Sequence, residues 1–226
     1  MDSTQKETIP KLHPEEQLQT ELEFKIDIPA TEPPEEVTAK IDRFLQSLDE
    51  VVLVKSSDTT RHFQYFDTPD KKVRTQGWTL RCVSGFNPEK GDGKAKYRYD
   101  YKIGEVGTEQ RKEGNKWLND ELSESELVAA YNLQSALPEG IGIAAEADTR
   151  HIKRTVRYKG SKIEMSYDMF DVKNGKKFSE LEIELEAGTA QTLIELKEKL
   201  RSAFPVEKSP EIKIQKYERV LNSLEN

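Results

Sequence analysis

The sequence predicts an α+β protein whose antiparallel sheet has one apolar face and one charged face. Several segments alternate apolar and charged residues with the two-residue period of a β-strand, beginning with ELEFKIDI at residues 21–28. Two other segments, 33–48 and 189–204, repeat apolar residues at helical spacing, as helices that cover a sheet do. The composition agrees, because only 35% of the 226 residues are hydrophobic while 34% are charged. Either part of the chain is disordered, or charged side chains lie in an unusual place such as a polar interior.

Composition and charge exclude several classes of protein. The net charge of -7 argues against a basic surface for nonspecific nucleic-acid binding. Cys82 is the single cysteine, so the chain has no intrachain disulfide, and the three histidines lack the spacing of a zinc site. No apolar run approaches the ~18 residues of a membrane span, and the N-terminus lacks the apolar core of a signal peptide. We therefore expect a soluble, cytoplasmic protein.

The chain divides into a short tail and one domain. Residues 1–20 are polar, contain two prolines and show little periodicity, so we expect a flexible tail. Residues 21–226 are expected to form a single domain. Within it, residues 85–95 are rich in Gly, Lys and Asp and predict a long hairpin loop.

Three further features place secondary structure in the second half of the chain. SESELVAAYNLQSAL at 123–137 predicts a helix, with Ser123 and Glu126 as a capping box. The pair Lys159-Gly160 separates two strands and predicts a hairpin. EIKIQKYERVLNSL at 211–224 predicts a last helix.

The charged rows on the strands leave two interpretations open. SELEIELE at 179–186 places four glutamates in one row, and they repel one another without counter-charge. On an open sheet, water and salt screen such a row. In a closed barrel with its apolar faces outward, the rows would line the inside. Carboxylates there could hold a hard divalent cation, and lysines and arginines could hold phosphate oxygens.

The order of these motifs resembles the CYTH family, also called triphosphate tunnel metalloenzymes. ELEFK matches the ExExK signature that opens the family, and YFDTP, TLR, YKIG, QRKE, a hairpin ending at Asp168, FSELEIELE and QKYER follow in order over residues 21–221. The resemblance implies an eight-stranded antiparallel β-barrel, a tunnel with a polar interior and helices packed outside. It also implies triphosphate substrates with Mg²⁺ or Mn²⁺ as cofactor.

The same resemblance implies the site residues, motif by motif. The expected metal ligands are acids on several strands: Glu21, Glu23, Glu113, Asp168, Glu180, Glu182 and Glu184. The expected phosphate-binding residues are bases: Lys25, Arg81, Lys102, Arg154, Arg157 and Lys216. The expected catalytic residues are Glu21, Glu23, Lys25 and Lys102. Glu186 stays outside this set, because the family pattern becomes apolar there.

Two departures from the family pattern concern the basic residues. The family often has a second arginine two positions after the first, where this chain has Val83, so that contact is missing or is supplied elsewhere. For the hairpin, the motif indicates Arg154, whereas strand alternation indicates Arg157, because Ile152 and Val156 share a face with Arg154. A bulge could reconcile the two positions.

The predicted function is divalent-metal-dependent hydrolysis of a triphosphate, most simply inorganic tripolyphosphate. Strand alternation puts Tyr97 and Trp78 on the outer face, which favours a substrate without a base to stack. The alternatives are a thiamine triphosphatase, a nucleoside triphosphatase, a class IV-type adenylyl cyclase, a noncatalytic polyphosphate-binding module, or a structural β-protein. We expect a small polyanion as partner, with no nucleic acid and no membrane, and the sequence leaves the oligomeric state open.

Overall fold

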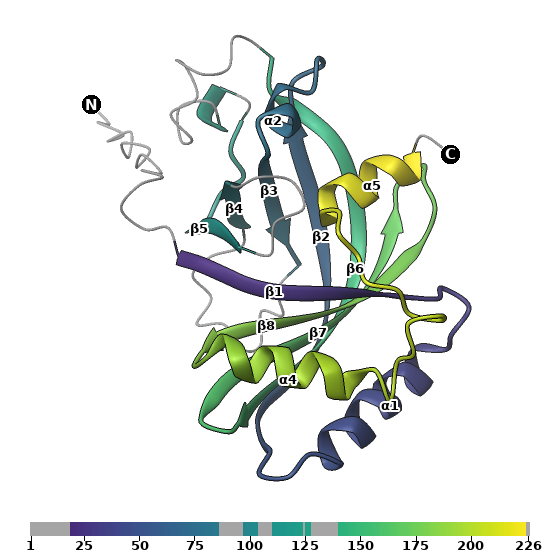
Figure 1. Cartoon of the computed structure of the whole chain (residues 1–226). Coiled ribbons are helices and arrows are strands. Elements are labelled where there is room, and N and C mark those ends of the chain that lie inside the picture. Colours follow the sequence, from purple (N-terminus) through teal and green to yellow (C-terminus); the bar gives the residue numbers. More distant parts are fainter. Residues whose placement is uncertain (1–18, 86–96, 104–109, 124, 128–139, 225–226) are drawn as a thin grey trace.

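Eight strands close into an antiparallel barrel in the computed structural model (Figure 1). The structure describes residues 19–85, 97–103, 110–123, 125–127 and 140–224. The strands are β1 (Gln19–Ile28), β2 (Val52–Asp67), β3 (Trp78–Ser84), β4 (Tyr97–Ile103), β5 (Gln110–Leu118), β6 (Gly142–Tyr158), β7 (Ser161–Val172) and β8 (Phe178–Ala187). Around the barrel they follow the order β1-β5-β4-β3-β2-β6-β7-β8 and return to β1. The predicted eight-stranded barrel is thus confirmed.

The helices are α1 (Pro34–Gln46), α2 (Lys72–Thr75), α4 (Ala190–Leu200) and α5 (Lys216–Leu224). The predicted capping pair is present, since the Ser123 backbone N–H donates to Glu126 at 2.8 Å, and residues 125–127 are helical. The rest of that predicted helix, most of the predicted 85–95 loop and residues 1–18 of the predicted tail lie outside the described residues. Gln19 and Thr20, expected in the tail, belong to β1.

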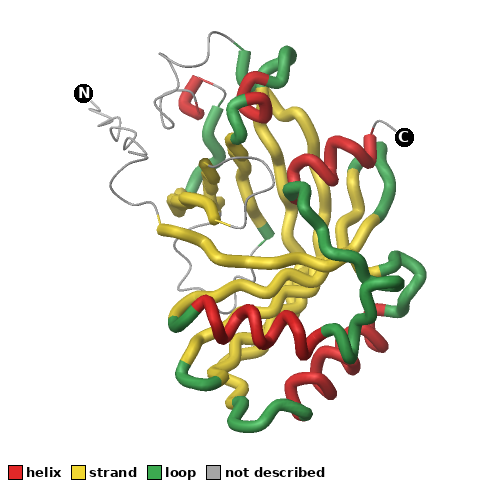
Figure 2. Tube along the Cα trace, in the orientation of Figure 1, coloured by secondary structure: helices red, strands yellow, loops and turns green. Residues whose placement is uncertain are grey.

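The largest apolar core lies outside the barrel. Figure 2 shows α1 and α4 together on one side of the curled strands. Their apolar stripes, including Ile41, Phe44 and Leu196, pack on outward residues of β1, β6, β7 and β8 such as Ile26 and Ile183. Because these apolar residues face the helices, the charged residues that alternate with them face the bore. No helix in the described part of the chain is long and apolar enough to cross a membrane.

The β6–β7 hairpin has the turn that the sequence predicts. Lys159 and Gly160 both have positive φ, of 46° and 76°, as the central residues of a type I′ turn require. The turn sets the register in which Arg154 faces Met165 and His151 faces Asp168. A one-residue slip would exchange the bore face and the outer face of both strands.

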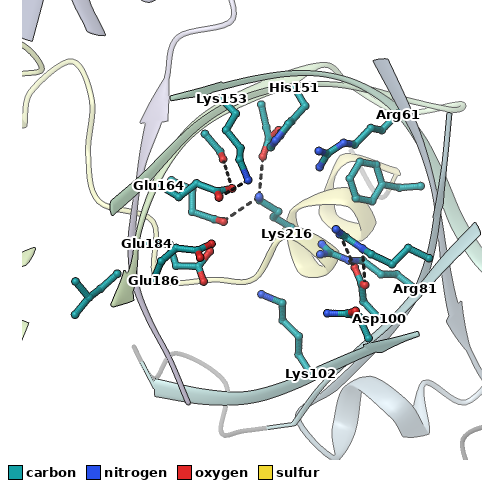
Figure 3. A pocket seen from close by; sticks show the side chains of 17 residues that line it. Arg61, Arg81, Asp100, Lys102, His151, Lys153, Glu164, Glu184, Glu186 and Lys216 are labelled. Carbon is teal, nitrogen blue, oxygen red and sulfur yellow. Dashed lines mark hydrogen bonds and ion pairs between the residues drawn. The ribbon is translucent and has the colours of Figure 1, made fainter. Parts of the chain in front are cut away.

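α5 differs from the other helices because it covers one end of the bore. Tyr217, Val220 and Leu221 pack against bore-facing residues of the strands, among them Phe63 and Phe170. Figure 3 looks into the bore, with α5 behind Lys216. The helix begins at Lys216, five residues later than the predicted start, because the chain before it is extended.

That extended segment, residues 209–215, is called the C-terminal strap here. Its Pro210 carbonyl accepts from the Asp27 backbone N–H at 2.8 Å, and the Ile212 N–H donates to the Lys25 carbonyl at 2.9 Å. β1 pairs with β5 only through residues 19–22, so the strap hydrogen-bonds to the later part of β1 where β5 does not. The strap therefore completes the wall beside β1 and leads α5 to the end of the bore.

Candidate triphosphate-binding site in the bore

The bore contains a cavity of about 320 Å³ whose walls carry opposite charges (Figure 3). Acids on β7 and β8 form one wall: Glu164, Asp168, Glu182, Glu184 and Glu186. Arginines and a lysine on β2, β3 and β4 form the opposite wall: Arg61, Arg81, Arg98 and Lys102. The alternation that places apolar residues under the helices places both sets inside, so the two walls follow directly from the strand pattern.

Two of the three arginines of the basic wall share one carboxylate. Arg81 and Arg98 both donate to Asp100 Oδ2, at 2.7 and 2.9 Å. Burial would raise the pKa of Asp100, but these two guanidinium groups hold it below its usual value. Burial, together with the charge of Arg98, lowers the pKa of Arg61 to about 10. An anion in the cavity would relieve the repulsion among these cations.

Lys216 projects from the first residue of α5 into the centre of the acidic wall. Its Nζ lies 2.7 Å from Asp168 Oδ2, 2.9 Å from Glu182 Oε2 and 3.5 Å from Glu180 Oε1. Burial would lower the pKa of Lys216, but these carboxylates raise it well above its usual value. The ammonium therefore stays charged and holds three buried acids together.

The acids around Lys216 titrate in different directions. Burial would raise the pKa of Asp168, but Lys216 and His151, whose Nδ1 lies 2.6 Å from Asp168 Oδ1, lower it strongly. The pKa of Glu182 is lowered as well, because Lys216 and Lys25 outweigh its burial and the charge of Glu23. For Glu180, burial outweighs the attraction of Lys216 and raises the pKa.

The ExExK strand contributes to the same cluster from β1. Lys25 forms an ion pair with Glu23 on its own strand and lies 3.5 Å from Glu182 on β8. All three side chains are largely buried. A smaller cavity of about 30 Å³ lies next to the first, and its lining includes Lys25, Arg81, Lys102, Glu182 and Lys216. Residues from β1, β3, β4, β8 and α5, far apart in the sequence, are thus brought together.

The structure places most predicted site residues in or beside the bore. Glu184 lines the cavity, and Glu180 lies beneath it, fully buried and bonded to Arg219 of α5 at 2.8 Å. The side chains of Glu21 and Glu113 lie outside the described part of the chain, although both residues belong to strands of the barrel.

Of the two hairpin arginines, Arg154 is a correction to the prediction, whereas Arg157 stays a prediction. Arg154 faces outward and donates to both oxygens of Asp42 on α1, at 2.9 and 3.2 Å, so it does not face the bore. Arg157 has the alternation of the bore-facing residues, but it is exposed and is not among the residues that line the cavity. Lys153 is the basic residue that β6 presents to the cavity, where it pairs with Glu164.

Alternation could have identified several residues that the prediction missed. Two of them, Lys153 and His151, lie on the same face of β6 as the predicted Arg157. His151 also lies directly opposite Asp168 in the register. Arg98 shares the charged face of β4 with Asp100 and Lys102, as alternation indicates. Arg98 and Arg61 both supply guanidinium groups to the basic wall. β3 itself does not supply a second one, because Val83 stands where the family often has an arginine.

The acidic wall also offers a set of oxygen ligands. Glu164, Glu184 and Glu186 each present a carboxylate oxygen, and these oxygens lie within 4.8 Å of one another. Hard divalent cations such as Mg²⁺ and Mn²⁺ prefer such ligands. These residues therefore fit the expected cofactor, and Glu186, left outside the predicted set, belongs to the group.

The sequence matches no protein-family model and no curated protein, whereas the fold matches solved structures. A putative adenylyl cyclase from Hippeastrum, described as having a dominant triphosphatase activity, aligns over 90% of this chain and 95% of its own, with 14% identity and a TM-score of 0.55. A putative adenylate cyclase from Bacillus halodurans aligns over 88% and 97%, with 16% identity and a TM-score of 0.51. The PH1819 protein of Pyrococcus horikoshii aligns over 89% and 98%, with 12% identity and a TM-score of 0.54. The resemblance predicted from the motifs is thereby confirmed at the level of the fold.

Proposed function

We propose that this protein hydrolyses a triphosphate with the help of a divalent metal ion, and that inorganic tripolyphosphate is the substrate. The observation that carries the proposal is the bore cavity, in which an acidic wall that holds Lys216 faces a basic wall. A linear polyanion that carries divalent cations is complementary to both walls. The fold shared with the Hippeastrum protein described as a triphosphatase supports the reaction type.

The basic wall would bind the phosphate oxygens. Arg61, Arg81 and Arg98 present planar guanidinium groups, which bind phosphate through paired hydrogen bonds, and Lys102 adds a point charge. Lys25 and Lys216 line the smaller cavity together with Arg81 and Lys102, and they would contact the phosphate chain there. Fixing all three phosphates in line would supply much of the rate enhancement, because phosphoryl transfer depends on positioning and charge stabilisation.

The acidic wall would serve the metal ion and the attacking water. Glu164, Glu184 and Glu186 would hold a divalent cation, with Glu23, Glu182 and Asp168 nearby in the same bore. Such a cation, when bound, neutralises phosphate charge. A glutamate of this wall would orient the water by accepting its hydrogen bond. The water oxygen would bond to the terminal phosphorus while the bond from that phosphorus to the bridging oxygen breaks. The proton that the water loses would pass to the glutamate and then to solvent, and phosphate and pyrophosphate would leave.

The aromatic residues at the cavity favour a substrate without a base. Phe63 lines the larger cavity, but the Arg81 guanidinium lies 5.4 Å from its ring centre. Tyr65 and Tyr217 line the smaller cavity, but they stack on each other with ring centres 5.1 Å apart. Trp78 and Tyr97 pack with the outer core beside Leu80, as alternation predicted. A nucleobase would therefore compete with existing contacts for each of these rings.

A phosphate-release screen tests the proposal. Tripolyphosphate, thiamine triphosphate and ATP are compared with Mg²⁺ and with Mn²⁺, and the ATP reaction is also analysed for cyclic AMP, because two of the matched structures are putative adenylate cyclases. We expect metal-dependent phosphate release, highest with tripolyphosphate. Cyclic AMP formation from ATP without phosphate release would instead identify a cyclase. Tight tripolyphosphate binding without turnover would identify a noncatalytic binding module.

A further inference from the structure

The carboxylate of Asp67 lies at the end of β2, outside the charged cavity, and all but one of its hydrogen bonds to the described residues are local. Oδ1 accepts from the backbone N–H groups of Thr68 at 2.8 Å and Val73 at 2.9 Å, and Oδ2 accepts from the Arg74 N–H at 3.3 Å. These bonds fix the turn that leads into α2. Asp67 is only 3% exposed, so these donors take the place of water around its oxygens.

The remaining bond connects this turn to α5, 150 positions away in the sequence. The Tyr217 hydroxyl donates to Asp67 Oδ2 at 2.9 Å, and Tyr217 is 2% exposed. Burial and the charge of Asp67 raise the pKa of Tyr217, so the hydroxyl remains a donor. Its ring stacks on Tyr65 of β2. Both ends of the Tyr217 side chain are therefore held by β2.

The position of Lys216 depends on this attachment. Lys216 is the first residue of α5, directly before Tyr217, and the extended strap precedes it, so no earlier helical turn holds it in place. Further along the helix, Arg219 anchors α5 through Glu180 and Asp27 at 2.8 and 2.5 Å. Tyr217 and Arg219 together fix the direction of the first turn, and Tyr217 is the anchor adjacent to the ammonium-bearing residue.

We propose that Asp67 is a positioning residue for the triphosphate site, which it serves by fixing Tyr217 and thereby holding the Lys216 ammonium against Asp168 and Glu182. This inference rests on the proposed function. The Lys216 contacts of 2.7 and 2.9 Å are those of short charged hydrogen bonds, which weaken steeply when the geometry changes. Loss of the Asp67 contact would thus reach the substrate by displacing Lys216, the residue next to Tyr217 on α5.

A double-mutant cycle tests the proposal. Tyr217→Phe removes the hydroxyl and keeps the stacked ring, and Lys216→Met removes the ammonium. We expect Tyr217→Phe to lower kcat/KM for tripolyphosphate by about tenfold, the order expected for one lost hydrogen bond to a charged group. In the Lys216→Met background the same change should alter kcat/KM by less than about twofold, because the group through which it acts is gone.

Tyr158→Phe is the matched control. The Tyr158 hydroxyl donates to Glu195 of α4 at 3.0 Å, so this change also removes a bond between a buried tyrosine and a carboxylate on another element, but outside the barrel. Its activity should stay within about twofold of wild type. A Tyr217→Phe effect as small as that of Tyr158→Phe, or one of equal size in both Lys216 backgrounds, would overturn the proposal.

Asp67→Asn provides a second variant, and unfolding provides a second measurement. The asparagine amide keeps the shape of the aspartate, but its nitrogen cannot accept a hydrogen bond as the replaced oxygen does. We expect Asp67→Asn to lower kcat/KM as well, and to do so only when Lys216 is present. If the wild-type protein neither binds nor hydrolyses tripolyphosphate, the proposed function fails. Urea unfolding of wild type, the two single variants and the double variant then tests separately whether Tyr217 holds Lys216 in place. Non-additive midpoint shifts support this positioning, and additive shifts refute it.

Discussion

Replacement of Lys216 by methionine should destabilise the protein strongly, because one ammonium compensates three buried carboxylates. Asp168 and Glu180 are 1% and 0% exposed, and both lose their contact with Nζ in the variant, as does Glu182. Removing one partner of a buried ion pair costs about 3–5 kcal/mol, since the other charge stays buried without compensation. The Arg219 guanidinium on Glu180 and the His151 imidazole on Asp168 remain, which places the expected loss in the lower part of that range.

Urea unfolding at pH 7, followed by circular dichroism, measures this loss directly. The loss in unfolding free energy should shrink as the pH is lowered toward about 4. Carboxylates without their lysine take up protons more readily, so the buried charge disappears. The test therefore includes a second series of unfolding curves at low pH.

Lys159→Met is the control for this substitution. Lys159 also contacts a carboxylate with two short bonds, 2.7 and 2.8 Å to Glu195, but on the exposed surface. Exposed ion pairs contribute little because water and salt screen them. An unfolding free energy of Lys216→Met no lower than that of Lys159→Met would refute the reasoning that Lys216 compensates the acid cluster.

Three other predictions concern the bore. Lys25→Ala and Glu182→Gln should each lower tripolyphosphate hydrolysis by at least ~100-fold, or roughly 2.7 kcal/mol of transition-state stabilisation, and wild-type turnover in both would contradict the assignment. Lys153→Met should lower hydrolysis by about tenfold while Arg154→Met stays within about twofold, because the neighbouring side chains face opposite sides of β6; equal effects in a phosphate-release assay would contradict this placement. Because the pKa of Asp168 lies below the unfolded value of about 3.9, its stabilisation is complete above that pH and disappears as the pH falls through the folded pKa. Thermal melts should therefore show the difference between wild type and Asp168→Asn shrinking below about pH 4, and a constant difference would argue against the lowered pKa.

Strand alternation predicted the faces of the barrel, because it depends only on backbone geometry. It placed Tyr97 and Trp78 on the outer face, as the structure has them. The closure of the sheet could not be derived in this way. Alternation also describes an open sheet with a solvated face, and the closed barrel was expected only from the resemblance to a family.

Side-chain partners were less predictable than faces. Arg154 matched a motif, but its partner Asp42 comes from a helix more than a hundred residues earlier, and no local pattern indicates that helix's position. Lys153 could have been found by applying alternation to the whole strand, since it lies two residues from His151 on the same face. α5 was predicted as a helix, but its entry into the end of the bore depends on the strap and on Tyr217, which local periodicity does not encode.

The strap and α5 also determine when a newly made chain can acquire the site. Arg219 and its partner Asp27 are separated by 192 positions, so ribosomal synthesis takes roughly 10–40 s to pass from one to the other. A nascent chain can form α1 and the β6–β7 hairpin during that time, but the wall beside β1 stays open and Lys216 is absent. If the site acts as proposed, unfinished chains cannot attack cellular triphosphates, and activity appears only after the C-terminal strap has been synthesised and has reached β1.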